Sequence, residues 1–318
     1  MEGKCSNPDC PAPISCHDGH EDYTQCPNWS KHHVEDVKKT TNQKKTNKST
    51  QIWTGEPFTI NDINLISYRN NPIIIGLAGK AKAGKTTFLA MLYTLLYDGG
   101  RFEKFGFSGT KTLLGLDKLY DKLKVKDKKV SLPETTPSSY LRLLHLALRN
   151  IENQLIDVLI TDASGEVFST WSQNKDDENA ENARWIYDNS NGFILFIDCD
   201  DLIKRKNQAK TEIIDIAEML KSDLKERPVL AVWSKADLKG EVHPTIRDSL
   251  KNELSEIFNK YFEIDISNFP SKNPDEIVHK NNLKTIDWLL DNIIIPAGDN
   301  IVISNEYVND IFLNYKGK

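Results

Sequence analysis

The sequence predicts an α/β protein: a three-layer sandwich in which helices cover both faces of a mostly parallel sheet, preceded by a small Cys-rich head. Two observations predict this. From residue 52 onward, short apolar runs alternate with stretches whose apolar residues recur at helical spacing, which is typical of a parallel sheet covered by helices. A glycine-rich segment, 79–86, then lies between one such apolar run and one such helix.

Three parts of the chain differ in composition. Residues 1–37 are rich in Cys, His and Pro and form the expected head. Residues 38–51 contain five lysines and neither an acidic nor an apolar residue, which favours a flexible, solvated linker over a surface for an anionic partner. Residues 52–318 form the large domain, with a C-terminal extension whose structure after residue 296 is not predicted.

The elements of the large domain follow from apolar periodicity. We expect the segments 140–148 and 155–160 to form a hairpin that places 140–148 as an antiparallel strand at the edge of the sheet. The acidic run 176–178 is expected to begin a solvated helix. The predicted strands are 72–77, 140–148, 155–160, 192–198, 228–233 and 262–266, and the predicted helices are 86–97, 111–123, 211–224, 245–261 and 283–293.

Charge and hydropathy exclude several classes of protein. The chain has 46 acidic and 41 basic residues, a net charge of −5, and this balance offers no clear nucleic-acid site. No apolar run approaches the roughly 18 residues that span a bilayer, and the polar N-terminus does not resemble a secretory leader. We therefore expect a cytoplasmic protein that does not contact membranes.

The glycine-rich segment fits the phosphate-binding pattern Gly-x4-Gly-Lys-Ser/Thr. Its glycines allow successive backbone N–H groups to point at phosphate oxygens, and the following helix adds its positive dipole end. The lysine is expected to reach the β- and γ-phosphates and the threonine hydroxyl to bind Mg²⁺. The predicted phosphate-binding residues are Gly79, Lys80, Ala81, Lys82, Ala83, Gly84, Lys85, Thr86 and Thr87.

Two further segments complete a magnesium and γ-phosphate site. Asp162 ends an apolar strand and is followed by Gly165 and Glu166; such an aspartate can hold Mg²⁺ through water, while the glycine N–H senses the γ-phosphate. A Pro-bounded loop at 131–137 carries Thr135 and Thr136, either of which could bind Mg²⁺. Thr136 is favoured, although the segment could also be an ordinary loop.

A third segment predicts which base is bound. An apolar strand is followed by Ser234, Lys235 and Asp237. A carboxylate at Asp237 can accept both edge N–H groups of guanine, which adenine lacks, and the lysine stem can lie along the base plane. The sequence therefore predicts a guanine nucleotide.

In this order, the motifs resemble those of the translation-factor-related class of P-loop GTPases, which contains the Ras-like switches, over residues 72–268. Two departures stand out: Ser234 replaces the usual Asn or Thr, and Glu166 stands where Ras-like enzymes have a water-orienting Gln. The segment 266–268, with Ser267, is a weak version of the last base-contacting loop. A carboxylate at Glu166 could position water or repel the γ-phosphate.

The whole layout, a Cys-rich head, a phosphate loop and a long first switch region, is similar to that of the bacterial double-GTPase families of the second type. This resemblance implies work within a bacterial conflict or defence system, beside a protein partner that would be a second GTPase. It implies nothing about what the switch controls.

The Cys-rich head predicts a zinc site. Zinc takes four N or S ligands in a tetrahedron, and either four thiolates or three thiolates with His20 would supply them. The alternative is a loose thiol-bearing tail. Cys199, in contrast, is expected to be a buried core thiol. The candidate zinc ligands are Cys5, Cys10, Cys16, His20 and Cys26.

The predicted function is that of a GTP-binding switch with slow, Mg²⁺-dependent hydrolysis. The phosphates are expected at the carboxyl ends of the parallel strands. The catalytic group would be Lys85, Thr136, Asp162, Gly165 and Glu166, with Thr86, Thr136 and Asp162 organising Mg²⁺. Two alternatives remain open: an ATPase, which needs no guanine selection by Asp237, and a nucleotide-bound scaffold without significant turnover.

Overall fold

The computed structural model describes residues 5, 7–12, 14–29, 55–66, 71–123, 125–126, 129–130, 141–151, 153–269 and 276–293. The chain divides into two compact units, Met1–Trp53 and Thr54–Lys318. The predicted linker at 38–51 lies outside the described residues.

The large unit is built on a seven-stranded sheet with the strand order β2-β5-β6-β1-β7-β8-β9. The five strands from β6 to β9 in this order are parallel, whereas β5 runs antiparallel to both of its neighbours. A separate two-stranded ladder, β3 with β4, precedes β5. The bounds are β1 Ile73–Ala78, β2 Phe105–Gly109, β3 Val125–Lys126, β4 Lys129–Val130, β5 Leu141–Asn150, β6 Leu155–Ala163, β7 Gly192–Asp198, β8 Val229–Ser234 and β9 Tyr261–Ile266.

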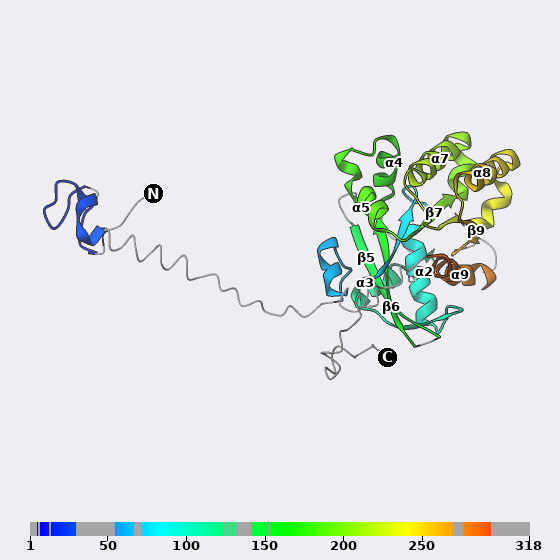
Figure 1. The fold of residues 1–318 in the computed structure, drawn as a ribbon, viewed down its shortest axis with the longest axis horizontal. Coiled ribbons are helices and arrows are strands. Elements are labelled where there is room, and N and C mark those ends of the chain that lie inside the picture. The colour runs from blue at the N-terminus through cyan, green and yellow to red at the C-terminus, as the bar shows by residue number, and fades with distance from the viewer. Residues whose placement is uncertain are drawn as a thin grey trace, which may run out of the picture. The chain divides into compact units, whose positions relative to one another are not determined.

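Helices cover both faces of this sheet (Figure 1). One face carries α4, α5, α6, α7 and α8, and the other carries α2, α3 and α9. The bounds are α2 Lys85–Tyr97, α3 Leu113–Lys122, α4 Gly165–Gln173, α5 Glu181–Asn189, α6 Cys199–Arg205, α7 Asn207–Lys221, α8 Pro244–Ile257 and α9 Glu276–Asn292, with short 3-10 turns η1 Tyr23–Gln25, η2 Ile60–Leu65, η3 Glu178–Ala180 and η4 Ala236–Glu241.

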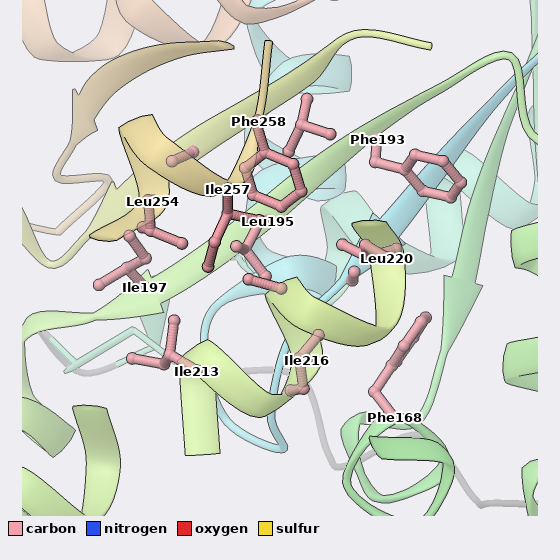
Figure 2. Close-up of a cluster of buried hydrophobic side chains, with 14 of the residues drawn as sticks. Phe168, Phe193, Leu195, Ile197, Ile213, Ile216, Leu220, Leu254, Ile257 and Phe258 are labelled. Carbon is pink, nitrogen blue, oxygen red and sulfur yellow. The ribbon is translucent and has the colours of Figure 1, made fainter. Parts of the chain in front are cut away.

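The central strand β7 shows why two helical layers are needed. Every residue of β7 is buried, and because successive side chains of a strand point to opposite faces, they enter two different cores. Phe193, Leu195 and Ile197 pack with α4, α7 and α8, as Figure 2 shows, whereas Ile194 and Phe196 pack with α2 and α9. A strand that is apolar on both faces requires cover on both faces, and the prediction of an α/β sandwich is confirmed.

The predicted position of the antiparallel strand is wrong. The sequence places the strand at 140–148 on the sheet edge, but β5 lies between β2 and β6, and β2 forms the edge. The segment of β2 reads Phe-Gly-Phe-Ser-Gly, and its two glycines weaken the strand signal. The helices α4 and α6 were not predicted. The helix expected to begin at the acidic run 176–178 is present as the turn η3, which Asp177 caps, followed by α5.

The N-terminal unit is described over residues 5, 7–12 and 14–29, where the turn η1 is capped by Asp22 and Cys26 is buried. Tyr23 packs edge-on against Trp29, with ring centroids 4.9 Å apart. Within the described parts of the chain, no helix has the length and apolarity needed to cross a bilayer.

Candidate functional site

A cavity of about 640 Å³ lies at the carboxyl ends of the parallel strands. Residues 81–84 of the loop after β1 line one end, together with the start of α2 and with residues 163–165 after β6. The segments that follow β8 and β9, at 234–237 and 266–269, line the other end. After the ligand groups predicted to bind there, we call these the phosphate end and the base end.

The phosphate loop takes its form from two glycines. Gly79 and Gly84 both have positive φ values, 138° and 91°, which side chains with a Cβ rarely adopt. A Cβ at Gly79 would also lie 3.0 Å from Phe196 Cβ. Gly84 then caps α2, so the helix begins at Lys85 with its N–H groups at the cavity.

Lys85 is buried beneath the loop. Its Nζ donates to the carbonyl oxygens of Gly79 at 2.8 Å and of Lys80 at 2.9 Å. Burial lowers the pKa of Lys85 to about 8, although the Asp162 carboxylate opposes this shift. The lysine thus binds its own loop here, and a phosphate would have to replace those carbonyls or share the ammonium with them.

Asp162 lies beside the start of α2 at the end of β6 and is fully buried. Its Oδ1 accepts a hydrogen bond from Thr86 Oγ1 at 3.0 Å, which brings together the two side chains predicted to organise Mg²⁺. Its Oδ2 is ion-paired with Arg142 Nη2. Arg142 stands directly opposite Asp162 in the antiparallel ladder of β5 and β6, so the guanidinium neutralises the carboxylate.

Gly165 closes the phosphate end from the β6 side. A Cβ built on Gly165 would fall 1.9 Å from Ala81 N and 2.0 Å from the Lys80 carbonyl carbon, so only glycine allows this approach. Ser164 caps α4 by accepting from Glu166 N at 3.3 Å. Glu166 is exposed in the first turn of α4 and does not line the cavity. Its negative charge there interacts favourably with the helix dipole.

The base end is already arranged around Asp237. Ser267 Oγ donates to Asp237 Oδ1 at 2.6 Å, which leaves the other carboxylate oxygen for a ligand. Ser234 donates to the Ile197 carbonyl oxygen at 3.2 Å, and its Cβ would lie 3.6 Å from a Cβ at Gly84. Ser234 therefore ties β7 to β8 and lies against the phosphate loop.

Lys235 and Phe269 border the same end of the cavity. Lys235 Nζ donates to Asp198 Oδ2 at 2.7 Å, which fixes the direction of the lysine stem. Burial raises the pKa of Asp198, and the Lys235 ammonium opposes the shift. Phe269 retains 39% exposure, so its ring is accessible to a flat ligand.

Lys80, the second residue of the phosphate loop, faces another partner. It is ion-paired with Glu212 of α7, and Glu212 also accepts from Arg205 at 2.8 Å. Arg205 in turn binds Asp201 of α6. This network anchors the loop to the neighbouring helices.

The structure brings most of the predicted site residues together around one cavity. The segments at 79–87, 162–165, 234–237 and 267 meet at one edge of the sheet. Thr135 and Thr136 lie outside the described residues, so their predicted role stays a prediction. Three residues of this site were not predicted from the sequence: Arg142, Asp198 and Phe269. For Arg142 the signal was present, because a tight hairpin fixes which residues stand opposite.

The cysteines of the head do not form a metal site in the described part of the chain. Cys5, Cys10, Cys16 and Cys26 are all thiols, and no group of three or more His, Cys, Asp or Glu side chains among the described residues could hold a metal ion. His17 N–H donates to Cys10 Sγ at 3.4 Å and is the largest cause of the lowered pKa of that thiol. Cys199 is fully buried, as predicted.

Comparisons with known proteins identify the large unit. The family model described as Double-GTPase 2 matches residues 73–289, which span the sheet and both helical layers. No curated protein matches the chain. Among solved structures, one similar chain is described as the crystal structure of a mutation variant of SsGBP, with 14% identity, a TM-score of 0.36, and 73% of this chain aligned to 61% of that one. This chain thus spans less than two thirds of that relative, and the TM-score is too low for the likeness to bear on fold or function.

Proposed function

Since this chain belongs to the Double-GTPase 2 family, we propose that it is a GTP-binding molecular switch that hydrolyses GTP slowly with Mg²⁺. The observation that carries the proposal is the pairing of two ends in one cavity. A glycine loop with a buried lysine forms one end, and a carboxylate held by Ser267 forms the other. A nucleotide needs both.

The base end supports guanine over adenine. Because Ser267 occupies Asp237 Oδ1, the carboxylate is oriented before a ligand arrives, and a charged acceptor makes strong hydrogen bonds to two N–H donors. Asp237 is exposed in the cavity. Adenine offers no such donor pair, so a base that covers the carboxylate without pairing it would cost about 1–3 kcal/mol. GTP should therefore bind on the order of tenfold more tightly than ATP.

The phosphate end supports a magnesium site. Thr86 and Asp162 place a hydroxyl and a carboxylate within 3.0 Å of each other, and oxygen donors of this kind are those Mg²⁺ prefers. Bound Mg²⁺ would neutralise charge on the β- and γ-phosphates. Lys85 would donate to the phosphates, and the Gly165 N–H would contact the γ-phosphate.

The proposal of slow turnover is supported by the contacts of the arginine near the site. Arg142 is held by Asp162, so its charge is committed to that carboxylate. An arginine supplied by a partner can accelerate such reactions about 10³–10⁵-fold. We propose an intrinsic rate below about 0.01 s⁻¹ and a protein partner, a second GTPase in a bacterial conflict or defence system, that raises it. Thr136 would complete the catalytic group, and Glu166 would join it only by turning its exposed side chain toward the cavity.

We also propose that the head binds zinc through Cys5, Cys10, Cys16 and Cys26, with His20 as the alternative fourth ligand. As placed, the described side chains do not converge on a metal, so binding would have to draw the thiols together. Support comes from the four cysteines within residues 5–26. Elemental analysis should find about one zinc per chain. Zinc retained in full by a Cys5→Ser, Cys10→Ser double variant would contradict the site, and Cys199→Ala serves as the control.

The function is tested by identifying the nucleotide that the purified chain retains, followed by competition between GTP and ATP and an assay of phosphate release. We expect a guanine nucleotide and slow release. Equal affinity for GTP and ATP would favour an ATPase. Tight GTP binding with no phosphate release, even with candidate partners, would favour the scaffold.

A further inference from the structure

The phosphate loop contains a lysine whose backbone would prefer glycine. Residues 80–83 form a turn in which Ala83 N–H approaches the Lys80 carbonyl oxygen at 3.4 Å. Lys82 is the third residue of this turn and has a φ of 65°. A positive φ at the third residue of a turn selects glycine or asparagine, and a lysine there strains the backbone.

The three lysines of this loop have different surroundings. Lys85 is buried and bound to two loop carbonyls, and Lys80 is ion-paired with Glu212. Lys82 is exposed and lines the cavity. Within the described residues, no hydrogen bond or ion pair engages its ammonium.

Strained backbone positions are retained mostly at functional sites. Packing of the loop does not explain why a lysine occupies position 82, because Lys82 is exposed and a glycine would relieve the turn. Binding of a ligand in the cavity does explain it. A nucleoside triphosphate would place several negative charges beside this loop, and a charged donor binds phosphate oxygens strongly.

On the basis of the proposed function, we propose that Lys82 is a second phosphate-binding cation, whose ammonium contacts the triphosphate from the exposed side of the loop while Lys85 contacts it from below. The side chain adds charge to a phosphate end whose carboxylate, Asp162, is already paired with Arg142. Its contribution should therefore grow with the number of phosphates on the ligand.

The experiment compares Lys82→Gly with Lys225→Gly in the full chain. Lys225 is also a left-handed lysine, with a φ of 55°, and it is exposed and does not line the cavity. Both substitutions relieve the same backbone strain, so both should keep or raise the melting temperature. Only Lys82→Gly removes a charge from the site.

Dissociation constants for GTP, GDP and guanosine are measured with Mg²⁺ at low and high salt. For Lys82→Gly we expect GTP to bind about tenfold more weakly, GDP to lose less, and guanosine to be unchanged. The salt dependence of GTP binding should become shallower, because one exposed charge is gone. Lys82→Arg should restore affinity to within about threefold, and Lys225→Gly should match the wild type.

Two results would overturn the inference: GTP affinity and salt dependence unchanged in Lys82→Gly, or equal losses for GTP and guanosine, which would indicate a role in loop shape. The wild type and Lys85→Ala separate this failure from failure of the proposed function. If the wild type binds GTP and Lys85→Ala does not, unchanged binding by Lys82→Gly removes only the role of Lys82. If the wild type binds no nucleotide, the proposed function fails and this inference fails with it.

Discussion

The two ends of the cavity differ in how far they are prepared for a ligand. At the base end, Asp237 is oriented by Ser267 and Lys235 is fixed by Asp198, while the ring of Phe269 stays accessible. At the phosphate end, the polar groups bind one another. Lys85 donates to its own loop, and Asp162 is paired with Arg142.

This difference indicates that a nucleotide would meet the two ends in different ways. Recognition of the base requires little rearrangement, so its affinity is not reduced by ordering. Recognition of the phosphates must exchange internal contacts for contacts to the ligand, so the phosphate end is where binding is coupled to conformation. Substitutions at the two ends should therefore differ in what they change besides affinity.

The largest effect is expected for Lys85→Ala. Removing the ammonium eliminates charge-assisted hydrogen bonds to the phosphates, together about 4 kcal/mol or close to a thousandfold in GTP affinity. Because the buried ammonium is destabilised by desolvation, the empty protein should unfold at the same temperature or higher. Titration with a fluorescent nucleotide and circular dichroism measure both quantities. Lys204→Ala, an exposed lysine on α6, is the control, and undiminished GTP binding by Lys85→Ala would contradict the phosphate loop.

Arg142→Gln should break the internal pairing of the phosphate end. The substitution leaves the buried Asp162 carboxylate without its cation, which should lower the free energy of unfolding by about 3 kcal/mol in the absence of Mg²⁺. Added Mg²⁺ and GDP should stabilise this variant more than the wild type. Urea denaturation with and without Mg²⁺ measures the difference. The control is Arg149→Gln on the same strand, where the half-buried guanidinium donates to the Asn153 carbonyl oxygen and not to a carboxylate. Equal losses in the two variants would refute a special role for Arg142.

Asp237→Asn should affect the base end alone. Replacing one carboxylate oxygen by an amide removes an acceptor for guanine, so GTP should bind about 2 kcal/mol more weakly, or roughly thirtyfold. Xanthine carries an oxygen where guanine has its amino group, and XTP should bind the variant better than the wild type. Competition binding tests this, with Asp265→Asn on β9, which pairs with Lys239, as the control. Unchanged GTP selectivity would mean that Asp237 does not read the base.

The smallest effect concerns pH. Lys85 must be protonated to bind phosphates, and its pKa in the empty protein is about 8. GTP affinity should therefore fall about fivefold between pH 7.5 and 8.8. Over the same range the free energy of unfolding of the empty protein should rise, because the unfolded lysine, with a pKa of 10.5, holds the proton that the folded one releases. Lys85→Arg remains charged, so a similar fall in that variant would assign the effect elsewhere.

At both ends the sequence predicted some of the site residues and missed others. The glycines at 79 and 84, the lysine at 85 and the aspartate at 237 lie within short local patterns, and backbone geometry dictates such patterns. Arg142 and Phe269 enter the site through tertiary arrangement: Arg142 through the register of β5 with β6, and Phe269 through the loop after β9. The edge strand β2 was missed for a related reason, because its pairing with β5 makes a strand of a segment with weak propensity.

The internal pairing of the phosphate end has a consequence for the lifetime of the empty protein. When a nucleotide leaves, Lys85 can return to the carbonyls of Gly79 and Lys80, and Asp162 to Arg142, so no buried charge is stranded. A nucleotide-free state stabilised in this way does not require an exchange factor for nucleotide release. We expect spontaneous exchange, with occupancy that follows the ratio of GTP to GDP around the protein.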